Sequence, residues 1–250
     1  MAEHRPDLSP RMLARIGGML YLVIIVGGLL GETLIRTRLI VPDDAAATAA
    51  NIRAEETLWR FGIGAEFLML ACTVALALIF FVLLRPVSRD LALLAVLFNL
   101  VSVAVEATNE LRLVGALVPL DDPEYLSAFG PEQLDAVSSL SVELYGYGFG
   151  AGLIFFGWEC LVLGYLIFRS GYLPKALGVL MAIAGACYLT NSFALLVAPT
   201  VADRLFPTIL LPAFVGEASL CLWLLVRGVN GEKWIPPASA PSTRRAGATA

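Results

Sequence analysis

Six long apolar segments constrain the fold of this chain more than any other feature of its sequence. Each has close to the ~20 residues that an α-helix needs to cross the hydrocarbon core of a bilayer. The segments cover approximately residues 16–35, 61–84, 91–114, 145–168, 176–197 and 209–226. Charged residues make up only 15% of the chain, against ~25% in a typical soluble domain. The sequence therefore predicts an all-α membrane protein, a bundle of six transmembrane helices that forms one domain over residues 16–230.

Lysine and arginine are unevenly distributed between the segments that connect the predicted spans. Eleven lie on the side that carries both chain ends, and six lie on the other side. Loop 115–142 has no lysine or arginine but holds five acidic residues. Basic residues near membrane spans are retained in the cytoplasm. We therefore expect both termini to be cytoplasmic, with an N-terminal segment over residues 1–15 and a disordered tail over residues 231–250.

Two connecting segments on the acidic side are predicted to be partly helical. Pro42-Asp43-Asp44 precedes an alanine-rich run, which is typical of a capped helix start. Gly130-Pro131-Glu132 is a second start signal, because proline and an acid are both favoured in the first turn. Leucine and valine then recur at helical spacing from Leu134 to Leu144. We expect this second segment to lie on the outer membrane surface before the fourth span.

Small residues recur at helical spacings in the fourth and fifth predicted spans. Small residues at such spacings let neighbouring helices approach closely in lipid. In the fourth span they form two overlapping G-x-x-x-G pairs, and in the fifth they are seven residues apart. These residues are Gly146, Gly148, Gly150 and Gly152, and Gly178, Gly185 and Ser192.

Seven polar side chains inside the predicted spans are the candidate ligand- or proton-binding residues. An ionisable group in lipid costs at least ~2.5 kcal/mol, so such groups face the bundle interior or water. The candidates are Glu32, Glu66, Glu106, Asn109, Glu110, Glu159 and Glu217. The first five lie toward the outer ends of their spans, and the last two lie near the middle. We expect them to line an outward-facing polar chamber with Glu159 and Glu217 at its floor.

The third span carries a polar stripe about 100° wide on one helix face. The stripe consists of Asn99, Ser102, Glu106, Asn109 and Glu110. It is either the lining of a polar chamber or a hydrogen-bonded seam that holds the bundle together. Glu106 and Glu110 are one turn apart and repel each other when both are ionised. We therefore expect one of them either to keep its proton or to pair with Arg112 or with an arginine of the first outer loop.

The two deep carboxyls, Glu159 and Glu217, have no cation nearby in the sequence. Each is either a hydrogen-bonded structural group or a residue that binds a proton, a cation or another ligand. We expect Trp59, Tyr145 and Tyr147, at the ends of spans, to be anchors at the membrane interface.

Several established kinds of active site are excluded by the residues that the chain lacks. Its one histidine, His4, lies in the polar N-terminus, which excludes histidine-ligated haem, the H-E-x-x-H zinc site and Ser-His-Asp catalysis. Its four cysteines fall in four different spans and none forms C-x-x-C, so we interpret them as packing residues. No phosphate-binding glycine loop and no basic patch with interleaved aromatics is present. We expect no catalytic residue, no metal, no cofactor and no nucleic-acid partner.

Three segments resemble recurring elements of the bacterial membrane-protein family known as domain of unknown function 4386. They are LIVPDDAAATAANI at Leu39–Ile52, LIFFGWECLVLGYLIFRSGYLPKALGVL at Leu153–Leu180 and LPAFVGEASLCLWLLVRGVN at Leu211–Asn230. The resemblance covers about residues 10–230. It implies a multi-pass protein of the bacterial inner membrane, and it supplies no catalytic residues to carry over.

Three classes of function remain open from the sequence. The first is the binding or transport of a small molecule, lipid or ion through the polar chamber. The second is a non-catalytic partner or sensor subunit of another membrane protein. The third is an intramembrane enzyme that modifies lipids, although the spans contain no clear nucleophile–base pair. The expected partners are accordingly the lipid bilayer, a small-molecule or lipid ligand, and a second membrane protein.

Overall fold

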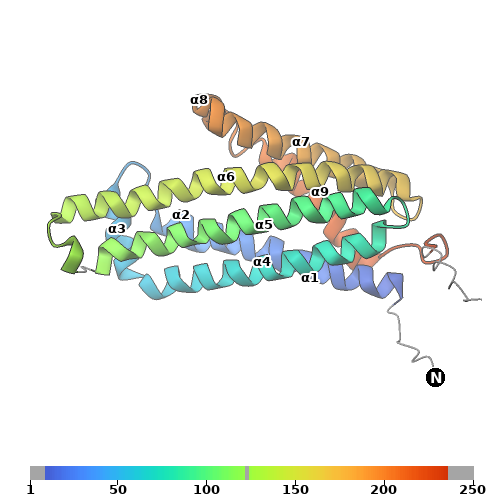
Figure 1. Ribbon diagram of the computed structural model, residues 1–250, viewed down its shortest axis with the longest axis horizontal. Coiled ribbons are helices and arrows are strands. Elements are labelled where there is room, and N and C mark those ends of the chain that lie inside the picture. Colours follow the sequence, from blue (N-terminus) through green and yellow to red (C-terminus); the bar gives the residue numbers. More distant parts are fainter. Residues whose placement is uncertain (1–8, 122–123, 236–250) are drawn as a thin grey trace, which may run out of the picture.

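The computed structural model describes residues 9–121 and 124–235, and within these ranges its regular structure is entirely helical (Figure 1). The long helices are α1 (Pro10–Leu30), α4 (Glu56–Leu84), α5 (Arg89–Leu117), α6 (Pro131–Ser170), α7 (Lys175–Val197) and α9 (Leu210–Val226). Five helical segments are long and apolar enough to cross a membrane, and α8 (Pro199–Leu205) with α9 makes a sixth if this pair, bent by 56°, is one span. The prediction of an all-α, multi-pass membrane bundle is therefore confirmed.

The surface of the bundle is suited to lipid. Large apolar side chains point outward along the helices, among them Leu68, Leu78, Leu97 and Leu222, each more than half exposed. A water-soluble helix would present polar residues at such positions. Contact with the acyl chains of a bilayer accounts for this exposed apolar surface.

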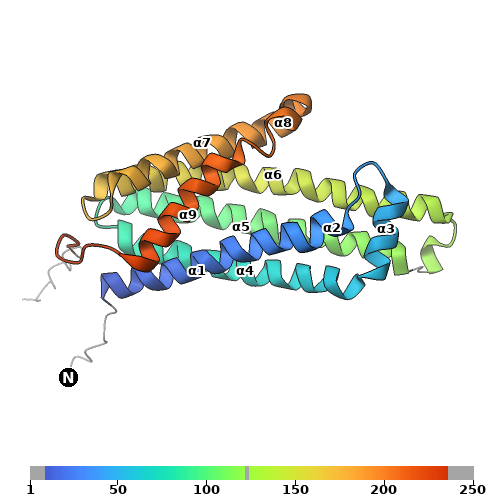
Figure 2. The same ribbon diagram turned by 180° about the vertical axis from the view of Figure 1, so that it is seen from behind.

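The two ends of the described chain lie at the same end of the bundle, where α1 begins and residues 228–235 finish (Figures 1 and 2). We call this end the basic end, because it carries Arg85, Arg89, Arg169, Lys175, Arg227 and Lys233. The opposite end, called the α3 end, carries α3 (Ala45–Ala54) and the acidic loop before α6. That the basic end faces the cytoplasm stays a prediction. Most of the tail expected to be disordered, residues 236–250, lies outside the described residues, as do residues 1–8.

Both predicted helix starts in the loops are found, but one prediction about their placement is wrong. α3 begins after Asp44, whose Oδ1 accepts a hydrogen bond of 2.8 Å from the backbone N–H of Ala47. α6 begins at Pro131 and continues without a break to Ser170, so the stretch around Leu134–Leu144 does not lie on the membrane surface as a separate element. Its polar side packs on α5, where the Ser138 hydroxyl donates to the carbonyl of Ala116 at 2.7 Å.

α6 is much longer than a membrane is thick. Its 40 residues span about 60 Å at 1.5 Å per residue, roughly twice the ~30 Å of the hydrocarbon core. A part of α6 therefore extends beyond the hydrocarbon core of any membrane that it crosses.

The first span is interrupted by a π-helical turn, η1 (Gly31–Arg36), before it resumes as α2 (Thr37–Leu39). Turns of this kind are uncommon and occur often at functional sites. The candidate Glu32 lies on this turn together with Arg36. Nothing in the apolar pattern of the first span predicts it.

α6 and α7 pack backbone to backbone through two reciprocal pairs of glycines. A Cβ on Gly178 would lie 2.6 Å from the carbonyl oxygen of Gly164, and a Cβ on Gly185 would lie 2.6 Å from that of Gly157. The predicted small-residue seam of the fifth span is therefore confirmed. The α6 glycines in this seam are Gly157 and Gly164. They lie closer to the basic end than the four α6 glycines predicted from the sequence.

Two apolar clusters fill the bundle interior. The larger one lies toward the basic end and includes the fully buried Leu83, Leu166, Ile167 and Leu224. The smaller one lies toward the α3 end and is centred on Trp59 and its neighbours. Five buried polar residues occur along α5 and α6 between these two clusters, namely Asn99, Ser102, Asn109, Glu110 and Glu159.

Candidate functional site

Arg36 is the centre of the polar site and connects three helical elements. Its Nε donates to Glu32 Oε2 at 2.7 Å, and one terminal nitrogen donates to Glu66 Oε1 at 3.0 Å. The same nitrogen donates to the Tyr145 hydroxyl at 3.3 Å, and the guanidinium lies 5.6 Å from the centre of the Tyr145 ring. The π-helical turn η1, α4 and α6 therefore meet at one cation.

Small residues leave space beside Arg36. Gly31 on η1 and Gly62 on α4 line a cavity of about 20 Å³, together with Arg36, Trp59 and Glu66. A water molecule needs a cavity of about 10–15 Å³ measured in this way. The space beside Arg36 is therefore large enough for a water molecule.

α5 adds three polar side chains to the site. Glu110 is 2% exposed and Asn109 is 3% exposed, while Glu106 is half-buried. Asn109 donates its amide to the Tyr145 carbonyl at 2.9 Å. One buried oxygen on each of the three residues has no hydrogen-bond partner in the described part of the chain: Glu106 Oε1, Asn109 Oδ1 and Glu110 Oε2. We call Glu32, Arg36, Glu66, Glu106, Asn109, Glu110 and Tyr145 the Arg36 cluster.

The glycines of the fourth span make room for these α5 side chains. Glu106 lies against Gly152 and Asn109 lies against Gly148, so closely that a Cβ on either glycine would overlap the polar group. The G-x-x-x-G spacing of Gly148 and Gly152 therefore accommodates polar side chains instead of a helix backbone.

Charges in the Arg36 cluster do not balance. Four carboxyl groups surround one guanidinium, and Arg36 pairs with only Glu32 and Glu66. The expected ion pair between an α5 glutamate and an arginine of the first outer loop is not formed among the described residues, because Arg36 joins the cluster but pairs with Glu32 and Glu66. The alternative partner, Arg112, is exposed and forms no ion pair among the described residues.

The polar stripe continues along α5 toward the middle of the bundle. Ser102 donates to the Gly152 carbonyl at 2.9 Å, and the Asn99 amide donates to Glu159 Oε2 at 2.9 Å. Asn99 and Glu159 are both almost fully buried. The stripe therefore faces α6 along its length and forms a polar seam between the two helices.

Glu217 occupies a separate position between α1, α7 and α9. Its two oxygens accept hydrogen bonds from two phenols, Tyr21 at 3.1 Å and Tyr188. Glu217 therefore has two donors but no cation, and it is not in contact with the Arg36 cluster.

Two residues expected to be interfacial anchors are instead buried. Tyr145 is 6% exposed and belongs to the Arg36 cluster. Trp59 is 2% exposed, and its indole N–H donates to the Leu113 carbonyl at 3.0 Å. One signal could have found Tyr145, because it is seven residues from Gly152 and fourteen from Glu159 and so shares their helix face.

The depth of the site follows from helix lengths. If the basic residues Arg89 and Arg169 mark one edge of the hydrocarbon core, the other edge lies about 20 residues along each helix. That distance leads to Asn109 on α5 and to Phe149 on α6. The Arg36 cluster thus lies near the far edge, whereas Glu159, ten residues from Arg169, lies near the middle.

The described residues contain no group of three or more His, Cys, Asp or Glu side chains arranged to hold a metal ion. The candidate chemistry of the site is therefore built from carboxyl groups, one guanidinium, a phenol and amides.

Comparison with known proteins identifies relatives without an assigned activity. A family model described as "Domain of unknown function (DUF4386)" matches residues 16–228. An uncharacterised protein of Archaeoglobus fulgidus is 30% identical over 168 residues, which is 67% of this chain and 84% of that protein. No solved structure matches the chain.

Proposed function

The chain belongs to the DUF4386 family, whose function is unknown, and we propose that it binds protons reversibly at Glu106 and Glu110. The observation that carries this proposal is that Glu106, Asn109 and Glu110 of the Arg36 cluster each have one buried oxygen without a hydrogen-bond partner in the described residues. Buried polar atoms are nearly always paired, and an orphaned one calls for an explanation such as a bound ion or water. A proton shared between or carried by these carboxyls supplies the missing donor.

The charge of the cluster supports the same proposal. With every group ionised, four carboxylates and one guanidinium would leave a net charge of about −3 next to lipid. Removing unpaired charge from water is expensive, and intramembrane carboxyls commonly serve as proton-binding groups. Each proton that binds reduces the unpaired charge by one.

The space available favours a proton over a larger ligand. The cavity beside Arg36 has a volume of only about 20 Å³. Glu106 and Asn109 are already packed against α6 glycines. An amino acid, a sugar or a lipid headgroup would need these helices to separate.

The polar seam supplies a direction for a bound proton. From Glu106 the polar groups continue through Ser102 to Asn99 and Glu159, toward the middle of the bundle. Beyond them the large apolar cluster fills the interior toward the basic end. In this state, protons would enter from the α3 end and go no further, so transport across the membrane would require a second conformation.

The proposal is tested by labelling with a hydrophobic carbodiimide, which reacts with protonated carboxyls and leaves ionised ones unmodified. Purified protein in lipid nanodiscs is labelled over a range of pH, and its peptides are analysed by mass spectrometry. We expect adducts on Glu106 or Glu110, with a yield that decreases as pH rises. Glu143 is the internal control, because it lies on α6 near Tyr145 but is exposed to solvent.

Two outcomes would contradict the proposal. One is the absence of adducts on both α5 glutamates at every pH at which the protein stays folded. The other is equal labelling of Glu106, Glu110 and Glu143 with the same pH dependence, which would make the α5 carboxyls ordinary exposed groups. Either result would favour the alternative of a partner or sensor subunit, in which the polar seam only holds α5 and α6 together. The next experiment would then be to identify membrane proteins that co-purify with this chain.

A further inference from the structure

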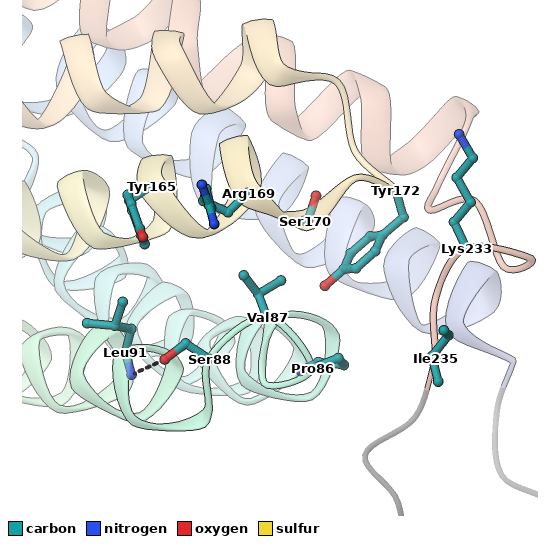
Figure 3. A pocket seen from close by; sticks show the side chains of 10 residues that line it. All are labelled: Pro86, Val87, Ser88, Leu91, Tyr165, Arg169, Ser170, Tyr172, Lys233 and Ile235. Atoms are coloured by element: carbon teal, nitrogen blue, oxygen red, sulfur yellow. Dashed lines mark hydrogen bonds between the residues drawn. The ribbon is translucent and has the colours of Figure 1, made fainter.

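A second polar pocket lies at the basic end, far from the Arg36 cluster (Figure 3). Its volume is about 410 Å³. The turn between α4 and α5 contributes Ser88, the end of α6 contributes Arg169 and Ser170, and the last described segment contributes Lys233. Three parts of the chain that are distant in sequence therefore build this basic pocket.

The basic pocket is electropositive. Arg169 and Lys233 line it, and no acidic residue is among its lining residues. Neither basic side chain forms an ion pair within residues 9–121 and 124–235. α5 also begins here, with Ser88 at its N-cap, and the start of a helix carries partial positive charge and free N–H groups.

One side of the basic pocket is apolar and continues along the surface that faces lipid. Leu91 and Tyr165 line this side. Farther along the same two helices, Leu94 and Trp158 are 37% and 43% exposed. An amphipathic ligand could therefore place a charged group beside Arg169 and Lys233 and its apolar part along α5 and α6.

The wall of the basic pocket is held in place by hydrogen bonds. The Tyr172 hydroxyl and the Trp234 indole N–H both donate to the carbonyl of Leu83, at 2.6 and 3.0 Å. Burial raises the pKa of Tyr172 above its ordinary value, so this phenol keeps its proton and remains a donor. These bonds fix the segment that carries Lys233 against α4. A ligand therefore meets a pocket that is largely preorganised, which reduces the entropy lost on binding.

We propose that the basic pocket binds the phosphate group of an anionic membrane lipid. Basic pockets between membrane helices are suited to lipid phosphates, because cations and helix N–H groups meet the headgroup at the depth where it lies. A free phosphate ion shares the recognised chemistry. The lipid is favoured because the apolar side would bind acyl chains, which a soluble anion lacks.

The test is native mass spectrometry of the full chain released from detergent, after titration with phosphatidylglycerol, with phosphatidylcholine or with inorganic phosphate. We expect phosphatidylglycerol to be retained in preference to phosphatidylcholine. In the double variant Arg169→Gln, Lys233→Gln we expect its affinity to decrease about thirtyfold, because each basic residue at an anionic membrane surface contributes about fivefold. The control is Lys175→Gln, Arg227→Gln, which removes two exposed basic residues from the same end without changing the pocket lining.

Each result bears on the proposal in a defined way. One result would be that the protein retains inorganic phosphate in a way that depends on Arg169 and Lys233 but retains no phosphatidylglycerol. The pocket would then be a phosphate site for a soluble ligand, and the lipid proposal would be wrong. The proposal would be overturned if phosphatidylglycerol and phosphatidylcholine were retained equally. It would also be overturned if both double variants lost the same affinity for phosphatidylglycerol, because general attraction to the basic end would then explain the binding. A third variant, Arg169→Lys, Lys233→Arg, preserves charge and should bind lipid within a few fold of wild type. Circular dichroism of every variant separates loss of binding from loss of fold.

Discussion

Arg36 determines how the carboxyl groups at the α3 end are arranged. Its hydrogen bonds reach two glutamates and one tyrosine on three different elements, and its side chain is 17% exposed. Removing one member of a half-buried ion pair leaves the other charge without compensation, which costs more than the pair contributes. Arg36 is therefore the residue at which a single substitution should disturb the site most.

We predict that Arg36→Gln destabilises the protein by about 3 kcal/mol, because Glu66 is left partly buried without a cation. Thermal unfolding in detergent, followed by tryptophan fluorescence, measures this loss. Glu66→Gln in the Arg36→Gln background should recover part of it, as a double-mutant cycle would show.

Arg38→Gln is the matched control for this prediction. Arg38 pairs with Glu55 at 2.7 Å, but its side chain is 60% exposed. An exposed pair contributes at most about 1 kcal/mol. Equal losses in Arg36→Gln and Arg38→Gln would contradict the account of Arg36 as the centre of the site.

At the scale of helices, the glycines have two different uses. Gly157 and Gly164 bring the α6 backbone against α7, whereas Gly148 and Gly152 accept the side chains of Asn109 and Glu106. The same residue type thus produces close helix packing on one face of α6 and a polar seam on another. Residue spacing alone does not distinguish the two uses, because the neighbouring helix decides which atom fills the space.

We predict that Gly178→Ala destabilises the bundle by about 1–3 kcal/mol, the cost of overpacking a well-packed interface. A Cβ at this position would lie 2.6 Å from the Gly164 carbonyl oxygen and from the Phe168 backbone nitrogen. Neither backbone atom can move aside as a flexible side chain would. Thermal unfolding of the purified variant checks the prediction.

Gly146→Ala serves as the comparison, since nothing lies within 4 Å of a Cβ at Gly146. Alanine is favoured over glycine in a helix by up to about 1 kcal/mol. We therefore expect Gly146→Ala to leave stability unchanged or to increase it slightly. If the two variants unfold at the same temperature, the α6–α7 contact does not depend on close glycine packing.

The positions of the helices could be predicted from the sequence, but the places where a helix is interrupted or continuous could not. Apolar runs of about 20 residues indicate membrane helices directly, and Asp44 and Pro131 mark two helix starts. The π-helical turn η1 has no comparable signal in the apolar pattern, and the contacts that Arg36 makes from it with α4 and α6 join residues distant in sequence. The continuity of α6 has no clear signal either, since leucine and valine at helical spacing from Leu134 to Leu144 predict a helix on the membrane surface as readily as an extension of the fourth span.

At the scale of the whole molecule, the two proposed sites lie at opposite ends of the bundle. The Arg36 cluster is at the α3 end, and the basic pocket is at the end where the described chain starts and finishes (Figure 1). The distribution of lysine and arginine predicts that the basic end faces the cytoplasm. On this assignment protons would bind from outside the cell, and the lipid phosphate would bind in the inner leaflet.

This orientation is tested with single cysteines in a variant whose four native cysteines are replaced by alanine. We expect Ser127→Cys, in the exposed loop before α6, to react with a membrane-impermeant thiol reagent in intact cells. Glu232→Cys, at the basic end, should react only after the cells are opened. The reverse labelling pattern would show that the molecule has the opposite orientation in the membrane. Protons would then enter from the cytoplasm.

The composition of the site could be predicted only in part. Every candidate carboxyl was identified from its place in an apolar span, because a charge in lipid is conspicuous. The grouping could not be predicted, since sequence alone does not show that Glu217 lies between Tyr21 and Tyr188 while Glu106 and Glu110 lie near Arg36. That separation depends on which helices are neighbours, and hydropathy carries no such information.

The most direct test of proton binding at Glu106 and Glu110 is infrared difference spectroscopy of the protein in nanodiscs between two values of pH. Protonated and ionised carboxyls absorb at different frequencies, and a carboxyl shielded from water is distinguished from an exposed one by its band position and its slow exchange with deuterium oxide. We predict a shielded carboxyl band that responds to pH in wild type and in Glu143→Gln, and that is lost in the double variant Glu106→Gln, Glu110→Gln. A pH response that is the same in the double variant as in wild type would contradict the account, because the protons would then bind elsewhere.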